Sequence, residues 1–317
     1  MESIPKDSIL EFNPDTLQFL RQQYNLDKPG RIQEAIDLLE EWIKKQPHFR
    51  KKDFSRDYLE RTIIITKGSV ERAKMKLDRI CTYRTLYPSF FGVRDMRNCE
   101  SLSYIKGAFL PKLTKEHYRT FMIKTTAKSY PSGFMEMYQY FFRQCEYIQA
   151  HDYCNGLILF LDAKEANIME TLKAYNISEL RQLLLIIKVP SAYSISEGYA
   201  MRLKGVHLLS ESKAIDAIVS LFKQVFSAKI ASRIAVHKTI DTFYEYVPKE
   251  TLPRDYGGNE KSLTELHEQF QEILSGKEFS EYLAEMHKAN TNEDLRVLTE
   301  DDEALGVPGT FRALAVD

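Results

Sequence analysis

The chain has 317 residues, of which 44% are hydrophobic and 28% are charged, values that are typical of a globular protein and exclude wholesale disorder. Forty-four Lys and Arg residues oppose forty-five Asp and Glu residues, so the overall charge gives no reason to expect a nucleic-acid partner. At roughly 150 residues per domain, the length predicts two domains, or one large domain with an appendage.

The N-terminal third carries the pattern of amphipathic helices. Apolar residues recur at three- and four-residue spacing in three segments, at residues 15–24, 31–45 and 69–86, which predicts three helices. Ser69 is a suitable N-cap for the third. Tyr87-Pro88 ends it, because the residue before a proline avoids the helical conformation. We expect a helical N-terminal domain over residues 1–98.

The pattern changes over residues 99–260, where strands alternate with helices. The predicted strands are Tyr118–Thr125, Leu157–Leu161, Gly205–Leu209 and Ile234–His237, and the predicted helices are Gly133–Ala150, Ile168–Lys188 and Lys213–Lys229. Helices of this length between strands indicate βαβ crossovers, and hence an α/β domain with a mostly parallel sheet. Residues 261–317 are predicted to form a polar, helical C-terminal tail.

Signals for targeting, cofactors and catalysis are few. The charged N-terminus lacks an apolar signal-peptide core, and the densest apolar runs have five residues, whereas a membrane span needs about 20. The four cysteines form no C-x-x-C pair, which is typical of a cytoplasmic protein with reduced thiols. No phosphate-binding loop, dinucleotide fingerprint or nucleophile elbow is present. His151 and Cys154 could share a metal ion, and Asp162 could be catalytic at a strand end. A structural role is the stronger reading for each, so we predict no enzyme, metal or cofactor.

Five segments, in the right order along the chain, resemble the CRAL-TRIO (Sec14-like) lipid-transfer family, and more closely its tocopherol-transfer and retinaldehyde-binding branch. These segments are Gly68–Asp78, Gly156–Asp162, Arg202–His207 with Lys229–His237, Pro248–Gly258 and Gly306–Asp317. The last resembles the ending of invertebrate tocopherol-transfer-like members.

Two departures from the family pattern bear on function. Where the family has a basic run, residues 58–66 keep a single basic residue, Arg61. Residues Val189–Glu197 contain an insertion of about eight residues beside the place where the resemblance puts the ligand. The identity of the ligand therefore cannot be carried over from the family.

The resemblance implies a small all-helical domain followed by an α/β/α lipid-binding domain, with a mobile lid helix over an apolar cavity. Residues 213–229 have the two-sided pattern that a lid needs, although an ordinary surface helix has it too. The candidate ligand-binding residues are apolar positions of the strands, the cavity wall and the lid: Leu157, Leu159, Ile168, Leu172, Tyr199, Met201, Leu203, Val206, Ile218, Leu221, Phe222 and Phe226. Several of these are expected to pack only the protein core.

Four basic residues stand at the motif positions that form a phosphoinositide-binding cleft in the tocopherol-transfer branch: Arg202, Lys204, Lys229 and Arg233. Arg202 and Lys204 alternate along one predicted strand, and Lys229 and Arg233 are four residues apart. Such side chains bind phosphate through charge-assisted hydrogen bonds. Solvated surface charge is the alternative.

The resemblance implies a cytoplasmic carrier of a hydrophobic small molecule such as a retinoid, carotenoid or tocopherol, which acts peripherally at phosphoinositide-containing membranes. A phospholipid or phosphoinositide exchange protein and a non-transferring regulatory adaptor remain as alternatives. The expected partners are the ligand and the membrane surface, and a monomer is favoured.

Overall fold

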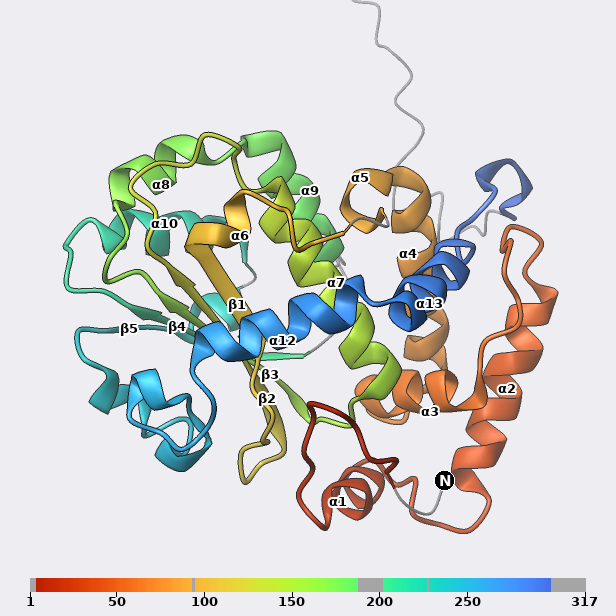
Figure 1. Cartoon of the computed structure of the whole chain (residues 1–317). Helices are drawn as coiled ribbons and strands as arrows, with labels where there is room; N and C mark the ends of the chain where they lie inside the picture. The colour runs from red at the N-terminus through yellow and green to blue at the C-terminus, as the bar shows by residue number, and fades with distance from the viewer. Residues whose placement is uncertain (1–3, 93–94, 188–201, 227, 298–317) are drawn as a thin grey trace, which may run out of the picture.

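The computed structural model describes residues 4–92, 95–187, 202–226 and 228–297 (Figure 1). Two sequence predictions lie outside these residues: the insertion Val189–Glu197 and the terminal segment Gly306–Asp317.

The N-terminal region is helical, as predicted. Its helices are α1 (Thr16–Gln23), α2 (Arg31–Lys45), α3 (Arg56–Ile65), α4 (Val70–Leu86), α5 (Pro88–Phe91) and α6 (Ser101–Tyr104). Ser69 caps α4 by accepting a hydrogen bond from the Arg72 amide at 3.3 Å. The sequence reading missed α3, because its β-branched run Thr62–Ile65 has low helix propensity. Packing stabilises α3 instead, since Leu59 and Ile63 are fully buried.

A five-stranded sheet forms the second part of the molecule. Its strands are β1 (Ile105–Phe109), β2 (Tyr118–Thr125), β3 (Gly156–Asp162), β4 (Leu203–Leu209) and β5 (Ile234–His237). They lie in the order β1-β2-β3-β4-β5, with β1 antiparallel to β2 and the other pairs parallel. The mostly parallel α/β sheet is confirmed. The antiparallel edge strand β1 was missed.

Helices α7 (Met135–His151), α8 (Ile168–Ala174), α9 (Ile177–Ile187), α10 (Ile215–Val225) and α11 (Ala228–Ala231) connect the strands (Figure 1). Two sequence predictions were wrong here. Residues 168–188 are not one helix, because the Asn176 side chain accepts hydrogen bonds from the Ser178 and Glu179 amides and starts α9 anew. The predicted helix 213–229 ends at Val225, and Lys229 lies on the separate helix α11.

The C-terminal part joins the two regions. After short 3-10 turns η1 (Ile240–Phe243), η2 (Lys249–Thr251) and η3 (Arg254–Tyr256), helix α12 (Leu263–Ser275) and helix α13 (Lys277–His287) follow, and η4 (Glu293–Leu295) comes last. The Tyr140 hydroxyl of α7 donates to the His267 carbonyl of α12 at 3.0 Å. Met286 of α13 packs into the N-terminal core. The predicted domain boundaries at residues 98 and 260 stay predictions.

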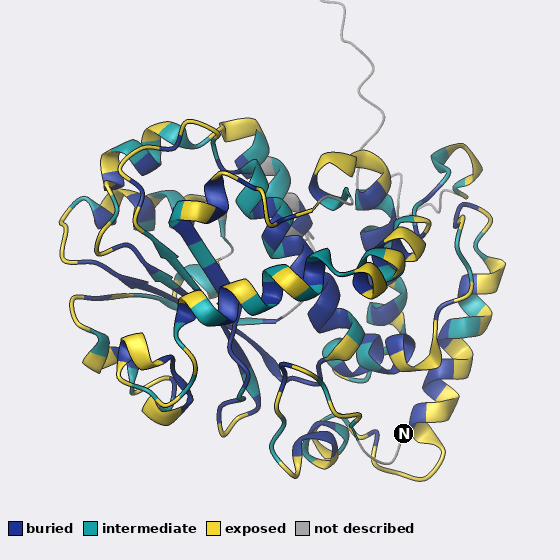
Figure 2. Cartoon of the chain, viewed as in Figure 1, coloured by how far each residue is buried: buried dark blue, intermediate teal, exposed yellow. Residues whose placement is uncertain are grey.

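The buried residues lie mainly where the sheet and the helices pack against each other (Figure 2). Figure 2 shows buried residues along the sheet and on the inner sides of the helices around it. None of the helices in the described ranges is long and apolar enough to cross a membrane.

Candidate functional site

A β-bulge in β4 shapes the candidate site. Leu157 of β3 pairs with Leu203, but the next residue, Ile158, pairs with Gly205, so Lys204 is the extra residue on β4. A bulge reverses the alternation of the strand and re-aims a side chain. It therefore puts Leu203 and Val206, which partner Leu157 and Leu159, on the same face of the sheet. Strict alternation would have put them on opposite faces.

Gly156, at the start of β3, makes room for the bulged residue. A Cβ atom at this position would lie 2.6 Å from the Arg202 carbonyl oxygen and 2.9 Å from Cε of Lys204. The backbone there has φ +146°, which side-chain-bearing residues rarely adopt. The aliphatic stem of Lys204 thus lies directly on the Gly156 backbone.

Arg202 is held in place by residues of both regions. Only 8% of it is exposed. Its guanidinium donates to the Tyr24 hydroxyl and, at 3.1 Å, to Oδ1 of Asn155, and it stacks 4.9 Å from the centre of the Tyr24 ring. Tyr24 in turn donates to Asn155 at 2.6 Å. The Nε atom of Arg202 is buried without a hydrogen-bond partner among the described residues.

Lys204 lies in a positively charged environment. Its Nζ lies 4.7 Å from the centre of the Tyr118 ring. Burial, and after it the charges of Arg202, Arg233, Lys67 and Lys229, together lower the pKa of this lysine to about 8. The four basic residues singled out in the sequence are thus brought together. We call these four residues and Lys67 the basic cluster.

Sequence reasoning missed Lys67 as a member of the cluster. Lys67 has φ 62° and Gly68 has φ 75° in the turn that ends α3. A Cβ atom on Gly68 would lie 2.8 Å from the Tyr24 carbonyl oxygen, so only glycine lets this turn approach the residue that holds Arg202. The signal was a Lys-Gly pair directly after the run 58–66, in which Arg61 is the only basic residue.

Four members of the basic cluster have no carboxylate partner in the part of the chain that the structure describes. Among the described residues, no Asp or Glu forms an ion pair with Arg202, Lys204, Lys229 or Arg233, whereas Lys124 of β2 pairs with Glu165 at 2.8 Å. Arg233 instead donates to the Leu203 carbonyl at 2.9 Å. Four cations that are close together and have no carboxylate partner among the described residues repel one another and attract a multiply charged anion.

Apolar residues cover the sheet face beside the basic cluster. Residues of α8, α10 and β4 form what we call the lid-side cluster, with these buried members: Ala163, Ile168, Val206, Leu208, Ile215, Ile218 and Phe222. Partly buried residues packed against it include Leu159, Leu172, Leu203 and Phe226. Eight of the twelve ligand-binding candidates thus lie together. Helix α10 turns its apolar side inward and leaves Asp216, Lys223 and Gln224 exposed.

The remaining candidates lie elsewhere. Leu157 belongs to the large central core with Phe109 and Phe121, and Leu221 is half-buried on α10. Tyr199 and Met201 lie outside the described residues.

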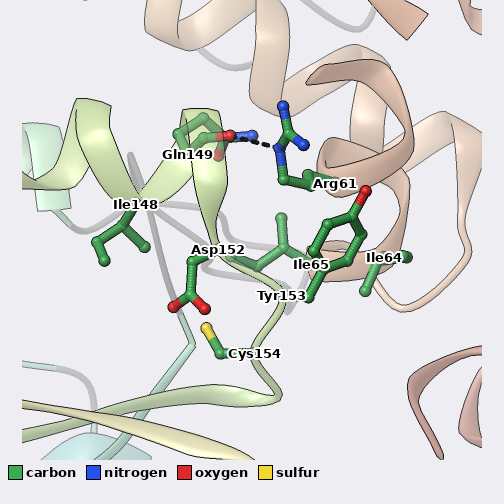
Figure 3. A pocket seen from close by; sticks show the side chains of 8 residues that line it. All are labelled: Arg61, Ile64, Ile65, Ile148, Gln149, Asp152, Tyr153 and Cys154. Carbon is green, nitrogen blue, oxygen red and sulfur yellow. Dashed lines mark hydrogen bonds between the residues drawn. The ribbon is translucent and has the colours of Figure 1, made fainter. Parts of the chain in front are cut away.

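Arg61 is not part of the basic cluster. Its Nε donates to the Gln149 carbonyl of α7 at 3.0 Å, and its guanidinium lies 5.6 Å from the centre of the Tyr153 ring (Figure 3). These residues line a cavity of about 10 Å³, which is room for one water molecule. Arg61 therefore connects α3 to α7.

The side chains weighed as possible catalytic or metal-binding groups have structural partners. Asp162 accepts hydrogen bonds from the Lys164 amide at 3.0 Å and from the Tyr256 hydroxyl at 2.8 Å. His151 lies 3.5 Å from Asp7. Burial raises the pKa of the Cys154 thiol to about 12. Within the described parts of the chain, His, Cys, Asp and Glu form no group that could hold a metal ion.

Comparison with known families gives the class of the domain. The CRAL/TRIO domain model matches residues 106–258, which comprise β1 to η3, and a model described as "Pinta-like, UBA domain" matches residues 28–101. Residues 106–258 therefore match a CRAL/TRIO domain, and a UBA-like helical region precedes them.

Individual relatives are distant. The alpha-tocopherol transfer protein-like proteins of mouse and human are each 29% identical over 65 residues, which are 20% of this chain and 19% of the relative. The match thus spans about a fifth of these relatives. The solved structure of Sfh5 superimposes on 89% of this chain and 98% of its own, with 12% identity and a TM-score of 0.44.

Proposed function

We propose that this protein carries a hydrophobic small molecule, an isoprenoid such as a retinoid, carotenoid or tocopherol, and releases it at phosphoinositide-containing membranes. The observation that carries the proposal is the position of the basic cluster beside the lid-side cluster. Leu203 packs against the lid-side apolar residues, while its carbonyl accepts a hydrogen bond from Arg233.

The apolar side supports a lipophilic ligand. Covering about 400 Å² of apolar ligand surface would contribute about 10 kcal/mol at 25 cal/mol per Å², and ordering costs reduce this to ordinary affinity. Phe222 and Ile218 of α10 supply such surface. One or two polar groups would orient the ligand. Tyr138 and Tyr175 are candidates, and burial raises the pKa of both, so they stay neutral donors.

The basic side supports a phosphorylated headgroup. Phosphates carry several negative charges on closely spaced oxygens, which match Arg202, Lys204, Lys229 and Arg233, none of which pairs with a carboxylate in the described ranges. The guanidinium of Arg202 is already oriented by Tyr24 and Asn155, so little side-chain entropy is lost on binding. Because α11 carries Lys229 and directly follows the lid helix α10, binding of an anion there can bias the position of the lid.

Ligand extraction tests the carrier role. The purified chain is incubated with a mixture of retinoids, tocopherols, sterols and phospholipids, and its organic extract is analysed by mass spectrometry. We expect one isoprenoid near one-to-one. Phe222→Asp should lose it, while Gln224→Asp, on the exposed side of the same helix, should retain it. If a phospholipid is bound instead, the protein is a lipid exchange protein rather than an isoprenoid carrier. If no lipid is bound, the regulatory adaptor is the function that remains.

Vesicle binding tests the membrane role. Vesicles that contain phosphatidylinositol bisphosphate are compared with phosphatidylserine vesicles of equal total charge. The double variant Lys229→Gln/Arg233→Gln should bind the former about tenfold or more weakly than the unmodified chain. Lys164→Gln removes a lysine that pairs with Glu211 outside the cluster and should bind normally. Equal binding of both vesicle types would contradict recognition of phosphoinositides.

A further inference from the structure

The environment of Lys204 differs from that of the lysines paired with carboxylates. Lys112 and Lys124 form ion pairs with Glu260 and Glu165, and in both cases the carboxylate raises the pKa of the amine. Lys204 lies half-buried on the Gly156 backbone and against the Tyr118 ring, among cations. Burial and like charge both disfavour the ammonium form. With a pKa of about 8, a useful fraction of Lys204 is the neutral, nucleophilic amine near neutral pH.

The residues around this amine can hold an anion next to it. Arg202, nine-tenths buried, has its Nε without a hydrogen-bond partner among the described residues. Lys229 and Arg233 add charge close enough to act on Lys204. A phosphate on a small molecule would be attracted to these groups, and its reactive carbon would then stay close to Lys204 for many collisions.

We propose that Lys204 is a covalent modification site that forms an imine with phosphate-bearing aldehydes. The amine nitrogen attacks the aldehyde carbon to give a carbinolamine, whose oxygen leaves as water while a C=N bond forms. The ammonium and the aldehyde thus become a protonated imine and one water molecule, and neither partner is oxidised or reduced. Occupation of Lys204 in this way would fill the basic cluster and block it for other anions.

Aldehyde labelling with the full-length chain tests the proposal. Pyridoxal phosphate is the probe, borohydride traps the imine, and mass spectrometry of peptides gives the labelled fraction of each lysine between pH 6.5 and 9.5. Pyridoxal, which lacks the phosphate, is the matched reagent. Lys112 and Lys124 in the same sample are internal controls.

We expect Lys204 to be labelled at least about tenfold faster than either control lysine at pH 7, because its amine fraction is larger by roughly two orders of magnitude and partial burial offsets some of this. The pH midpoint for Lys204 should be near 8. Pyridoxal should lose most of the preference. Lys229→Gln should raise the midpoint, since it removes one of the charges that lower the pKa.

Labelling of Lys204 no faster than that of Lys124 overturns the proposal, and so does an equal preference with pyridoxal. Lys204→Arg, which keeps the charge, provides the blank for assigning the peptide. The result is separable from the proposed function, because it uses no vesicles or isoprenoid. If Lys204 is labelled preferentially but the chain does not select phosphoinositide vesicles, the imine proposal stands and the phosphoinositide proposal falls. If the chain selects these vesicles but Lys204 is not labelled preferentially, the imine proposal falls and the phosphoinositide proposal stands.

Discussion

Two regions of the molecule bury arginine in opposite ways. On β2, Arg119 is fully buried and forms a bidentate ion pair with Asp152, at 2.9 and 2.7 Å, and it also donates to the Leu110 carbonyl at 3.1 Å. Arg202, at the start of β4, is nearly as buried but is held by a tyrosine and an asparagine, among further cations.

The difference separates an arginine whose charge a carboxylate neutralises from one whose charged neighbours are cations. A buried ion pair whose hydrogen bonds are satisfied stays closed, and its main effect is the large penalty for removing one partner. A cluster of cations costs stability in the absence of a counter-ion, and that cost is recovered when an anion binds. The first arrangement connects the sheet to its surroundings, and the second is suited to binding.

Asp152→Ala is the strongest test of the structural side. It leaves Arg119 charged and buried without its partner, and should lower the free energy of unfolding by about 3–5 kcal/mol. Denaturant titration measures this change. Asp53→Ala removes an exposed carboxylate from its pair with Lys51 and should cost far less stability, because water already solvates that carboxylate. Equal losses for the two variants would contradict the distinction.

Gly156→Ala tests the backbone under the basic cluster. The new Cβ meets the Arg202 carbonyl oxygen at 2.6 Å, at a positive φ, and should cost about 2 kcal/mol. Gly133→Ala is a matched control, since Gly133 also has positive φ but has no atom within 4 Å of the new Cβ. If both variants lose the same stability in thermal unfolding, the close contact at Gly156 has no energetic weight.

The pH dependence of stability distinguishes Lys204 from Lys124. Because the folded pKa of Lys204 is lowered to about 8, the unfolded chain binds more protons above that value. The native chain should therefore gain stability relative to Lys204→Met as the pH rises from 8 towards 10.4, by less than the about 3 kcal/mol that the two pKa values imply, because solvent screens this half-buried side chain. The pKa of Lys124 is raised by Glu165, so its contribution is present below the unfolded value and is lost as the pH rises further. Urea titrations at several pH values show whether the two signs differ.

Lys229→Gln gives the smallest expected change. Removing one exposed cation from the basic cluster relieves repulsion, so the free energy of unfolding should stay within about 0.5 kcal/mol of the native value or rise slightly. Lys173→Gln, which breaks an exposed pair with Glu170 at 2.8 Å, should lower it by a few tenths of a kcal/mol. Differential scanning calorimetry can rank the two. A clear loss for Lys229→Gln would show that this residue has a structural partner.

The sequence by itself determined the classes of the elements. Apolar periodicity identified α2 to the residue, the buried run of β3 and the mostly parallel sheet, because these patterns report local conformation and the burial of one face. It also identified four basic positions that the fold brings together. It did not show that residues 168–188 are two helices, since an asparagine that restarts a helix resembles any other polar residue in an amphipathic pattern.

Only the tertiary structure determines the register between β3 and β4 and which distant residues lie next to one another at the candidate site. The bulge at Lys204, which puts Leu203 and Val206 on one face, depends on pairing with β3. Lys67 reaches the basic cluster because the Gly68 turn packs closely against Tyr24, and Arg61 is drawn to α7 instead. These outcomes depend on which distant segments meet, and periodicity along the chain carries no information about such contacts.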